Sequence, residues 1–261
     1  MIDCRDVDER AIVDPGAQLG EDVRIGPFAV IGADVEIGPG SWIGPHVVIR
    51  GPTRIGRENR IYQFASIGED PQDKKYDDEP TRLEIGDRNT IREYVTINRG
   101  TIQDRGATTI GNDNWIMAYV HIAHDCVIGD DNILANAVTL AGHVHIDSFA
   151  NLGGFTKVHQ FCRVGRYSFC GMDTGLTRDV PPYVTASGMP AQPFGINSEG
   201  LRRRGFTPEQ IGTIKRGYKL LYRNGLRLEE ARAQLAELAA TQPEIAVLSE
   251  FLENSERGII R

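Results

Sequence analysis

The sequence predicts a mainly β protein, with a parallel β-helix of six-residue repeats over residues 1–190 and a C-terminal α-helical domain over 191–261. Two observations carry this prediction. An aliphatic residue recurs at every sixth position over long stretches, and 29 of the 261 residues are glycine, well above the usual share of about 7%. Six residues advance an α-helix by roughly 600°, so a stripe of this period cannot mark one helical face.

The repeat has 25 matches in three stretches. Its defining positions are Val13, Leu19, Ile25, Ile31, Ile37, Ile43, Ile49, Ile55, Ile61 and Ile67; Ile85, Ile91 and Ile97; and Ile110, Ile116, Ile122, Ile128, Leu134, Leu140, Ile146, Leu152, Val158, Val164, Cys170 and Leu176. This is the hexapeptide pattern of a β-helix. Three repeats form a coil of about 18 residues, so the matches predict about eight coils stacked roughly 4.8 Å apart.

Glycine follows the aliphatic residue in seven of the first repeats, at positions 20, 26, 32, 38, 44, 56 and 68. We expect it there because the chain bends, and glycine tolerates φ values that other residues avoid. The aliphatic side chain and the residue four positions later should both point into the coil.

Two polar stretches interrupt the repeat, near residues 69–84 and near residues 98–109. Loops of this length are often functional, and the alternative is a simple surface excursion.

Residues beyond about 190 show helical signals instead of the hexad. The segment Thr207–Gln210 supplies an N-cap, a first-turn proline and a capping-box partner, and Asn224 with Gly225 ends the predicted helix. Further helices are expected near 228–240 and after Pro243. This domain would cover the open end of the β-helix, where strand edges are otherwise unpaired.

Composition excludes several classes of protein. A net charge of −7 and an isoelectric point near 5.4 disfavour nucleic-acid binding. No apolar run is long enough to span a membrane, and no signal-peptide pattern is present, so a cytoplasmic protein is expected. The four cysteines form no CxxC pair and are expected to be buried thiols in a reducing compartment: Cys4, Cys126, Cys162 and Cys170.

The segment HIAHDC, residues 121–126, holds the strongest candidate for catalysis. His124 and Asp125 follow the inward Ile122 at positions that face outward, and a neighbouring carboxylate orients an imidazole and raises its basicity. His143 follows Asp125 by 18 residues, one full coil, and should stack directly above it. The alternative is a group of solvated surface histidines. Cys126 falls at an inward position and is expected to be a core thiol.

Clustered histidines also raise the alternative of a zinc site, which would need three ligands and an open position. His121 and His124 are three residues apart on an extended segment, which does not favour that reading. Further along the chain, Arg202, Arg203 and Arg204 form a basic cluster suited to a phosphate-bearing ligand, or else a solvated charge run.

Several motifs resemble the UDP-N-acetylglucosamine O-acyltransferases of lipid A synthesis: HIAHDC, AGH at 141–143, VHQF at 158–161, NSEGLRRRGF at 197–206, IYQFASIGE at 61–69 and DVPPYV at 179–184. The resemblance extends over essentially the whole chain. It implies left-handed winding and a homotrimer with sites between subunits. It also implies transfer of a 3-hydroxyacyl group from acyl carrier protein to the 3-hydroxyl of UDP-N-acetylglucosamine, with no metal or bound cofactor.

The resemblance also implies roles for individual residues. His124 would be the general base, Asp125 would orient it, and the Gly142 N–H would stabilise the oxyanion. The implied substrate-binding residues are His121, His143, His159 and Gln160 for the nucleotide sugar, and Asn197, Glu199, Arg203 and Arg204 for the uridine and phosphates. Asp73 and Lys75 match loop residues that contact substrate in the family.

Met172 lies where the family limits acyl length, and a bulky residue there predicts a medium-chain preference. Asn98 stands where family members often carry histidine, so any substrate contact from that position is in doubt.

Because acyl carrier protein is acidic, we expect it to dock on basic residues: Arg163, Arg166 and Arg178. A zinc hydratase of the same architecture, an N-acyltransferase for a 3-amino sugar and a purely structural solenoid are the alternatives.

Overall fold

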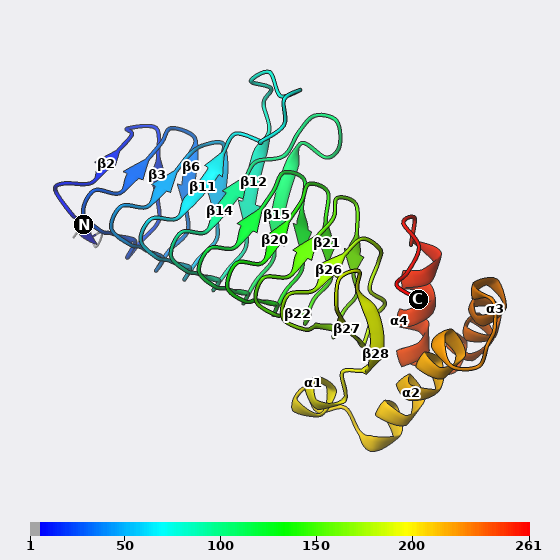
Figure 1. Ribbon diagram of the computed structural model, residues 1–261. Coiled ribbons are helices and arrows are strands. Elements are labelled where there is room, and N and C mark those ends of the chain that lie inside the picture. The colour runs from blue at the N-terminus through cyan, green and yellow to red at the C-terminus, as the bar shows by residue number, and fades with distance from the viewer. Residues whose placement is uncertain (1–5) are drawn as a thin grey trace.

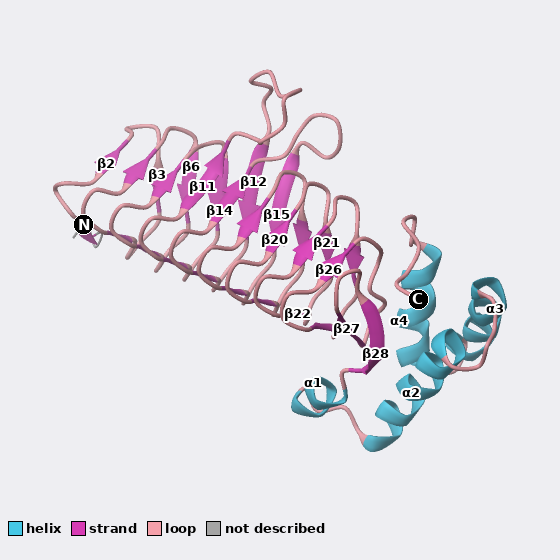
Figure 2. Ribbon diagram, in the orientation of Figure 1, coloured by secondary structure: helices cyan, strands magenta, loops and turns pink. Residues whose placement is uncertain are grey.

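The computed structural model describes residues 6–261 and shows a β-helix followed by four helices (Figures 1 and 2). Cys4 lies outside the described residues. The coils form a triangular prism with one sheet on each side. All strand pairs are parallel except the last, β27 with β28.

Sheet 1 has eleven strands. They are β1 (Asp6–Val7), β4 (Arg24–Ile25), β7 (Trp42–Ile43), β10 (Arg60–Ile61), β13 (Thr90–Ile91), β16 (Trp115–Ile116), β19 (Ile133–Leu134), β22 (Asn151–Leu152), β25 (Phe169–Cys170), β27 (Val184–Ser187) and β28 (Gln192–Ile196). Sheet 2 has nine strands: β2 (Ile12–Val13), β5 (Val30–Ile31), β8 (Val48–Ile49), β11 (Ser66–Glu69), β14 (Thr96–Asn98), β17 (His121–Ile122), β20 (Thr139–Leu140), β23 (Lys157–Val158) and β26 (Gly175–Leu176).

Sheet 3 has eight strands: β3 (Gln18–Leu19), β6 (Val35–Ile37), β9 (Thr53–Ile55), β12 (Arg82–Ile85), β15 (Ala107–Ile110), β18 (Val127–Ile128), β21 (His145–Ile146) and β24 (Arg163–Val164). The repeat positions pair in register from coil to coil, as Ile97 does with Ile122 and Ile122 with Leu140. The predicted inward positions from Val23 to Leu176 form one buried column, while those of the first coil are partly buried, and burial of each large aliphatic side chain contributes about 1.5–3 kcal/mol.

The predicted reason for the repeat glycines was wrong except at Gly68, whose φ is +76°. The other six glycines of that series have no positive φ. Five of these six are needed where stacked coils approach closely: a Cβ on Gly38 would lie 2.6 Å from the carbonyl carbon of Gly56, whereas one on Gly32 would meet nothing closer than 3.4 Å. The left-handed conformation falls instead on the third residue after the aliphatic one, and that residue is usually not glycine.

These left-handed positions carry stacked aromatic rings along the corner between sheets 1 and 2. Phe28, His46, Phe64, Tyr94 and Tyr119 stack in sequence with ring centroids 4.9–5.1 Å apart. A left-handed residue costs about 1–2 kcal/mol, and each aromatic pair returns about 0.5–1.5 kcal/mol. The stacking therefore offsets part of the backbone cost.

Both predicted loops leave the prism at the corner between sheets 2 and 3, where Figure 1 shows them side by side. Residues 70–81 join β11 to β12, and residues 99–106 join β14 to β15. The loops are shorter than the predicted stretches 69–84 and 98–109, because the first and last residues of each stretch belong to the flanking strands. Those strand residues read as loop in the sequence because their outward side chains are polar.

The C-terminal part holds α1 (Ser198–Arg203), α2 (Pro208–Tyr222), α3 (Leu228–Ala239) and α4 (Pro243–Glu253). The predicted capping box at Thr207 and Gln210 is present. Strand β28 and helix α1 were not predicted within 191–261. Tyr218 of α2 belongs to the buried column's cluster, and Ile259 forms a parallel bridge with Asp179, so the domain covers the end of the β-helix.

Two further expectations concern burial and hydropathy. Cys126, Cys162 and Cys170 are buried free thiols, as predicted, and burial raises the pKa of Cys126 and Cys170 to about 12. Among residues 6–261, no helix combines the length and apolar character needed to cross a membrane.

Candidate active site

The corner between sheets 2 and 3 gathers most of the predicted catalytic residues. Successive coils bring to it the loops 70–81 and 99–106, then His124 with Asp125, then Gly142 with His143, and then Gln160. The prism faces are flat, and the two loops form a wall beside the histidines. Because each position recurs every 18 residues, the spacing of the repeat places these groups at one corner.

His124 and Asp125 form a hydrogen-bonded pair with a buried carboxylate. The His124 Nδ1 lies 2.9 Å from the Asp125 Oδ2, and the Asp125 side chain is fully buried. The repeat predicts an outward direction for both residues, and Asp125 does leave the core, but the loop 99–106 covers it. The burial was therefore not predictable from the repeat alone.

The loop residue Thr101 completes the environment of Asp125. Its backbone N–H lies 3.0 Å from both carboxylate oxygens, and its hydroxyl donates to the Asp125 Oδ2 at 2.6 Å. Burial would raise the pKa of Asp125, but hydrogen bonds from His124 and Thr101 outweigh it and hold that pKa below its ordinary value. An ionised carboxylate at Nδ1 keeps the proton on that nitrogen and leaves the His124 Nε2 free as a base.

Gly142 lies against the His124 ring. A Cβ on Gly142 would lie 2.5 Å from the His124 Cε1 and 2.7 Å from its Nε2, so only glycine fits there. Within the described chain the Gly142 N–H has no hydrogen-bond acceptor. Gly142 therefore offers a free backbone donor on a residue that contacts the His124 ring, and such a donor is available to an oxyanion formed there.

His143 stacks above Asp125, as the 18-residue spacing predicts. Both residues have left-handed backbones, and the His143 N–H donates to the His124 carbonyl at 3.0 Å. The two imidazole rings meet edge to face with centroids 5.0 Å apart.

The remaining residues predicted for the sugar site flank this centre. His121 lies on β17, its Nδ1 is 2.7 Å from the Thr96 hydroxyl, and burial lowers its pKa, which favours the neutral ring. His159 and Gln160 are exposed one coil beyond His143. Asp73 and Lys75 lie in the loop 70–81, where the Asp73 carboxylate accepts the Lys75 N–H at 3.0 Å.

Asn98 and Arg99 anchor that first loop. Both side chains are buried; the Asn98 amide donates to the Asp70 carbonyl at 2.7 Å, and Arg99 donates to the Gly68 carbonyl and the Tyr76 hydroxyl. Asn98 therefore shapes the loop in this chain.

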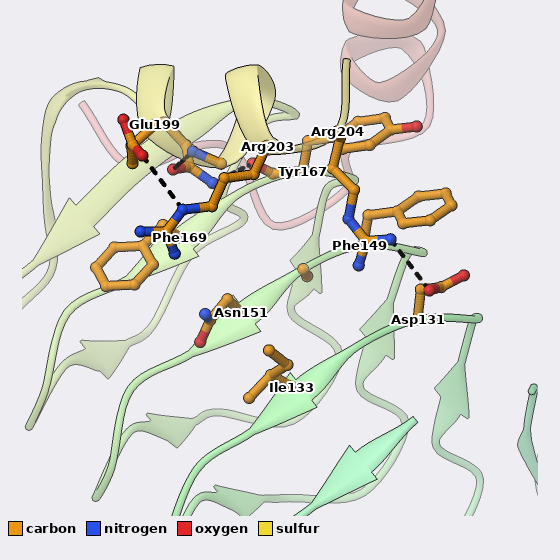
Figure 3. A pocket seen from close by; sticks show the side chains of 12 residues that line it. Asp131, Ile133, Phe149, Asn151, Tyr167, Phe169, Glu199, Arg203 and Arg204 are labelled. Atoms are coloured by element: carbon orange, nitrogen blue, oxygen red, sulfur yellow. Dashed lines mark hydrogen bonds and ion pairs between the residues drawn. The ribbon is translucent and has the colours of Figure 1, made fainter. Parts of the chain in front are cut away.

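A second cluster lies against sheet 1 and lines a cavity of about 450 Å³ (Figure 3). Asn197 caps α1 and also donates to the Tyr167 carbonyl. Glu199 accepts from the Arg203 Nε at 3.2 Å. Arg204 donates to Asp131 at 3.1 Å and lies 4.7 Å over the Phe149 ring. Two arginines beside partly exposed aromatic rings suit a phosphate joined to a planar base.

An apolar groove of about 430 Å³ crosses sheet 2. Its walls are Thr139, Ala141, Lys157, Val158, His159, Gly175, Leu176, Thr177, Met189 and Pro190. It begins beside the histidine corner and ends near the turn that carries Met172, which is 75% exposed. Three strand spacings separate β17 from β26, or roughly 14 Å.

A metal site is the other use for such a cluster. Donor atoms of His124, Asp125 and His143 lie within 4.8 Å of one another. The same Asp125 oxygens already accept hydrogen bonds from Thr101 and His124, and the Nδ1 atoms of both histidines face carboxylates. These donor atoms have partners, and the arrangement fits proton transfer better than metal ligation.

The fold and site define the class of the protein: a hexapeptide-repeat transferase with a left-handed parallel β-helix. The six-repeat model of bacterial hexapeptide transferases matches residues 16–51, 34–69 and 107–142. The second-domain model of UDP-N-acetylglucosamine O-acyltransferases matches residues 179–260.

Relatives named acyl-[acyl-carrier-protein]–UDP-N-acetylglucosamine O-acyltransferase include one from a Janthinobacterium species, 62% identical, and one from Herminiimonas arsenicoxydans, 59% identical. Each alignment covers 96% of this chain and 97% of the relative. The solved UDP-N-acetylglucosamine acyltransferase of Francisella novicida superimposes with a TM-score of 0.96 at 45% identity, covering 98% of this chain and 94% of that one. The chain belongs to the UDP-N-acetylglucosamine O-acyltransferase family.

Proposed function

We propose that this protein transfers a 3-hydroxyacyl group from acyl carrier protein to the 3-hydroxyl of UDP-N-acetylglucosamine, the first step of lipid A biosynthesis. The observation that carries the proposal is the His124–Asp125–Thr101 hydrogen-bond network, with its buried carboxylate, beside Gly142, whose N–H has no acceptor within the described chain. The full-length relatives carry the same activity in their names. Both substrates are cytoplasmic molecules, so we place the reaction in the cytoplasm.

We propose the following steps for the reaction. The His124 Nε2 removes the proton from the sugar hydroxyl while its oxygen attacks the thioester carbonyl carbon. The Gly142 N–H donates to the oxyanion, and Asp125 stabilises the imidazolium. When the intermediate collapses, the carbon–sulfur bond breaks and the Nε2 proton passes to the carrier thiolate. A positioned base contributes about 10²–10⁴-fold, and one oxyanion donor about 10²–10³-fold.

The sugar would lie among His121, His143, His159 and Gln160, with Asp73 and Lys75 of the first loop above it. Asn197, Glu199, Arg203 and Arg204 would hold the uridine and phosphates. These two groups lie at separate places on one protomer: the first at the corner between sheets 2 and 3, the second against sheet 1.

A homotrimer resolves this separation. Three prisms packed side by side bring the sheet 1 cavity of one protomer to the histidine corner of the next, so each site uses two chains. The thiol that carries the acyl group belongs to the phosphopantetheine of acyl carrier protein. The proposed reaction uses no metal or cofactor bound to this protein.

The apolar groove over sheet 2 is the proposed acyl site, and Met172 would set a medium-chain limit at its far end. The single-protomer groove is lined by Met189 and not by Met172. Met172 would therefore act from an adjoining protomer's side of the groove, and Met189 is a second residue whose size affects chain length.

The three arginines proposed to bind the acyl carrier protein differ in their surroundings. Arg163 donates to the Asn254 carbonyl and lies over the Phe251 ring, so it is engaged with the C-terminal domain. Arg178 follows β26 at the corner that carries His124, three coils further along, or roughly 14 Å. Arg178 and the exposed Arg166 are the better candidates for contact with an acidic carrier.

A transfer assay with purified protein tests the proposal. UDP-N-acetylglucosamine and its 3-amino analogue are compared with several 3-hydroxyacyl carrier proteins, alongside His124→Ala. We expect transfer to the hydroxyl sugar and a loss of at least about 100-fold in the variant. Retained activity in His124→Ala, or transfer to the amino sugar alone, would refute it. Stoichiometric zinc needed for activity would favour the hydratase alternative.

A further inference from the structure

The loop 99–106 brings a second carboxylate to the site. The Asp104 Oδ2 lies 2.8 Å from the His143 Nδ1. The Asp104 side chain is 39% exposed and that of His143 is 15% exposed. No repeat position predicts this contact, because Asp104 precedes His143 by 39 residues, which is not a whole number of coils.

The ring of His143 is held on several sides. It stacks on the Phe161 ring at 4.4 Å and meets the edge of the His124 ring. The Asp125 Oδ2 lies 3.9 Å from the same Nδ1 that Asp104 contacts. Since both carboxylates face Nδ1, that nitrogen carries a proton, and Nε2 is the nitrogen left for the substrate.

One loop aligns both carboxylates. Thr101 is fixed to Asp125 by its N–H and hydroxyl, and its carbonyl accepts the N–H groups of Asp104 and Gly106 at 3.4 and 3.0 Å. The position of Asp104 relative to Asp125 is therefore set by a tight turn. The loop that buries the partner of His124 also supplies the partner of His143.

We propose that Asp104 is a positioning residue that holds His143 as the Nδ1–H tautomer with its Nε2 directed at the bound nucleotide sugar. The site then contains two histidine–carboxylate pairs whose carboxylates differ in burial. The His124–Asp125 pair, with its buried carboxylate, moves the proton, and the His143–Asp104 pair, with its partly exposed carboxylate, holds the sugar nucleotide. This inference rests on the proposed function.

The test compares wild type, Asp104→Ala, Asp104→Asn, His143→Ala and the double variant Asp104→Ala/His143→Ala in the transfer assay. We expect Asp104→Ala to raise KM for UDP-N-acetylglucosamine about fivefold with kcat within about threefold, since a half-exposed pair is partly screened. Asp104→Asn should have a smaller effect, because its amide oxygen still accepts from Nδ1–H. In the double-mutant cycle, Asp104→Ala should add no further loss once His143 is gone.

A matched control is Asp87→Ala, which removes a 31% exposed carboxylate paired with Arg57 at a different corner. Its KM should equal that of wild type. An unchanged KM in Asp104→Ala, or additive losses with His143→Ala, would overturn the proposal. If Asp104→Ala unfolds, the proposal is tested instead with Asp104→Asn and with the double-mutant cycle of Asp104→Asn and His143→Ala. Absence of transfer by wild type, or full activity of His124→Ala, would instead refute the proposed function.

Discussion

The hydroxyl of Thr101 should control both the stability and the activity of the site. It donates at 2.6 Å to the Oδ2 of Asp125, a residue only 2% exposed, and that oxygen also faces His124. A hydrogen bond to a charged group contributes about 1.5–3 kcal/mol. Thr101→Val keeps the shape of the side chain and the backbone N–H bonds, and removes this one donor.

The expected loss of stability is about 2 kcal/mol at pH 7. Its pH dependence follows from the lowered pKa of Asp125. A lowered folded-state pKa contributes stability above the unfolded value, near 4, that is lost as the pH falls through the folded pKa. The difference between wild type and Thr101→Val should therefore be full at neutral pH and shrink below about pH 4.

Thermal unfolding at several pH values and steady-state kinetics measure the two effects. We expect kcat to fall about tenfold, which corresponds to about 1.4 kcal/mol in activation free energy. The reason is that the Asp125 carboxylate, which orients His124 in the proposed reaction, loses the hydrogen bond from the Thr101 hydroxyl. Thr109→Val, on the outer side of β15, is the control and should match wild type. A Thr101→Val enzyme with wild-type kcat and the same unfolding midpoint at pH 7 would refute the reasoning.

Three further predictions concern other parts of the site. Gly142→Ala should lower kcat at least about 100-fold without loss of folding, since its Cβ would displace the His124 ring; near-normal turnover would contradict this. Met172→Gly should shift the preferred acyl chain longer, at about 0.8 kcal/mol for each CH₂ buried; an unchanged profile, or a shift seen only in Met189→Ala, would argue against it. Arg204→Ala should raise KM for the nucleotide sugar about tenfold, and an equal KM would remove that residue from the phosphate site.

The six-residue period predicted the parts of the site that stand on the coils. It placed Ile122 in the core, His124 and Asp125 at a turn, and His143 one coil above, as the structure has them. The period is a strong predictor because stacked parallel strands force each position onto the one 18 residues later. It misjudged the glycines, because close approach between coils cannot be read from one strand.

The loops carried no such signal. Residues 99–106 have no period, so the contacts of Thr101 with Asp125 and of Asp104 with His143 were outside the reach of the sequence pattern. The cavity beside α1 was only partly foreseen, since the arginine cluster suggested a phosphate but not the rings of Phe149 and Tyr167 below it.

The insertions explain how a flat prism acquires a polar active centre. Along the axis, the loops 70–81 and 99–106 precede His124 by two coils and one coil, while the apolar groove and the C-terminal domain lie on the other side. In the proposed reaction, the loops contact the sugar from one side of His124, and the acyl chain extends along the groove on the other side, where His159 lines the groove and the proposed sugar site alike. That arrangement suits the proposed transfer, because the sugar hydroxyl must lie within reach of the His124 Nε2 and of the thioester carbonyl carbon at the same time.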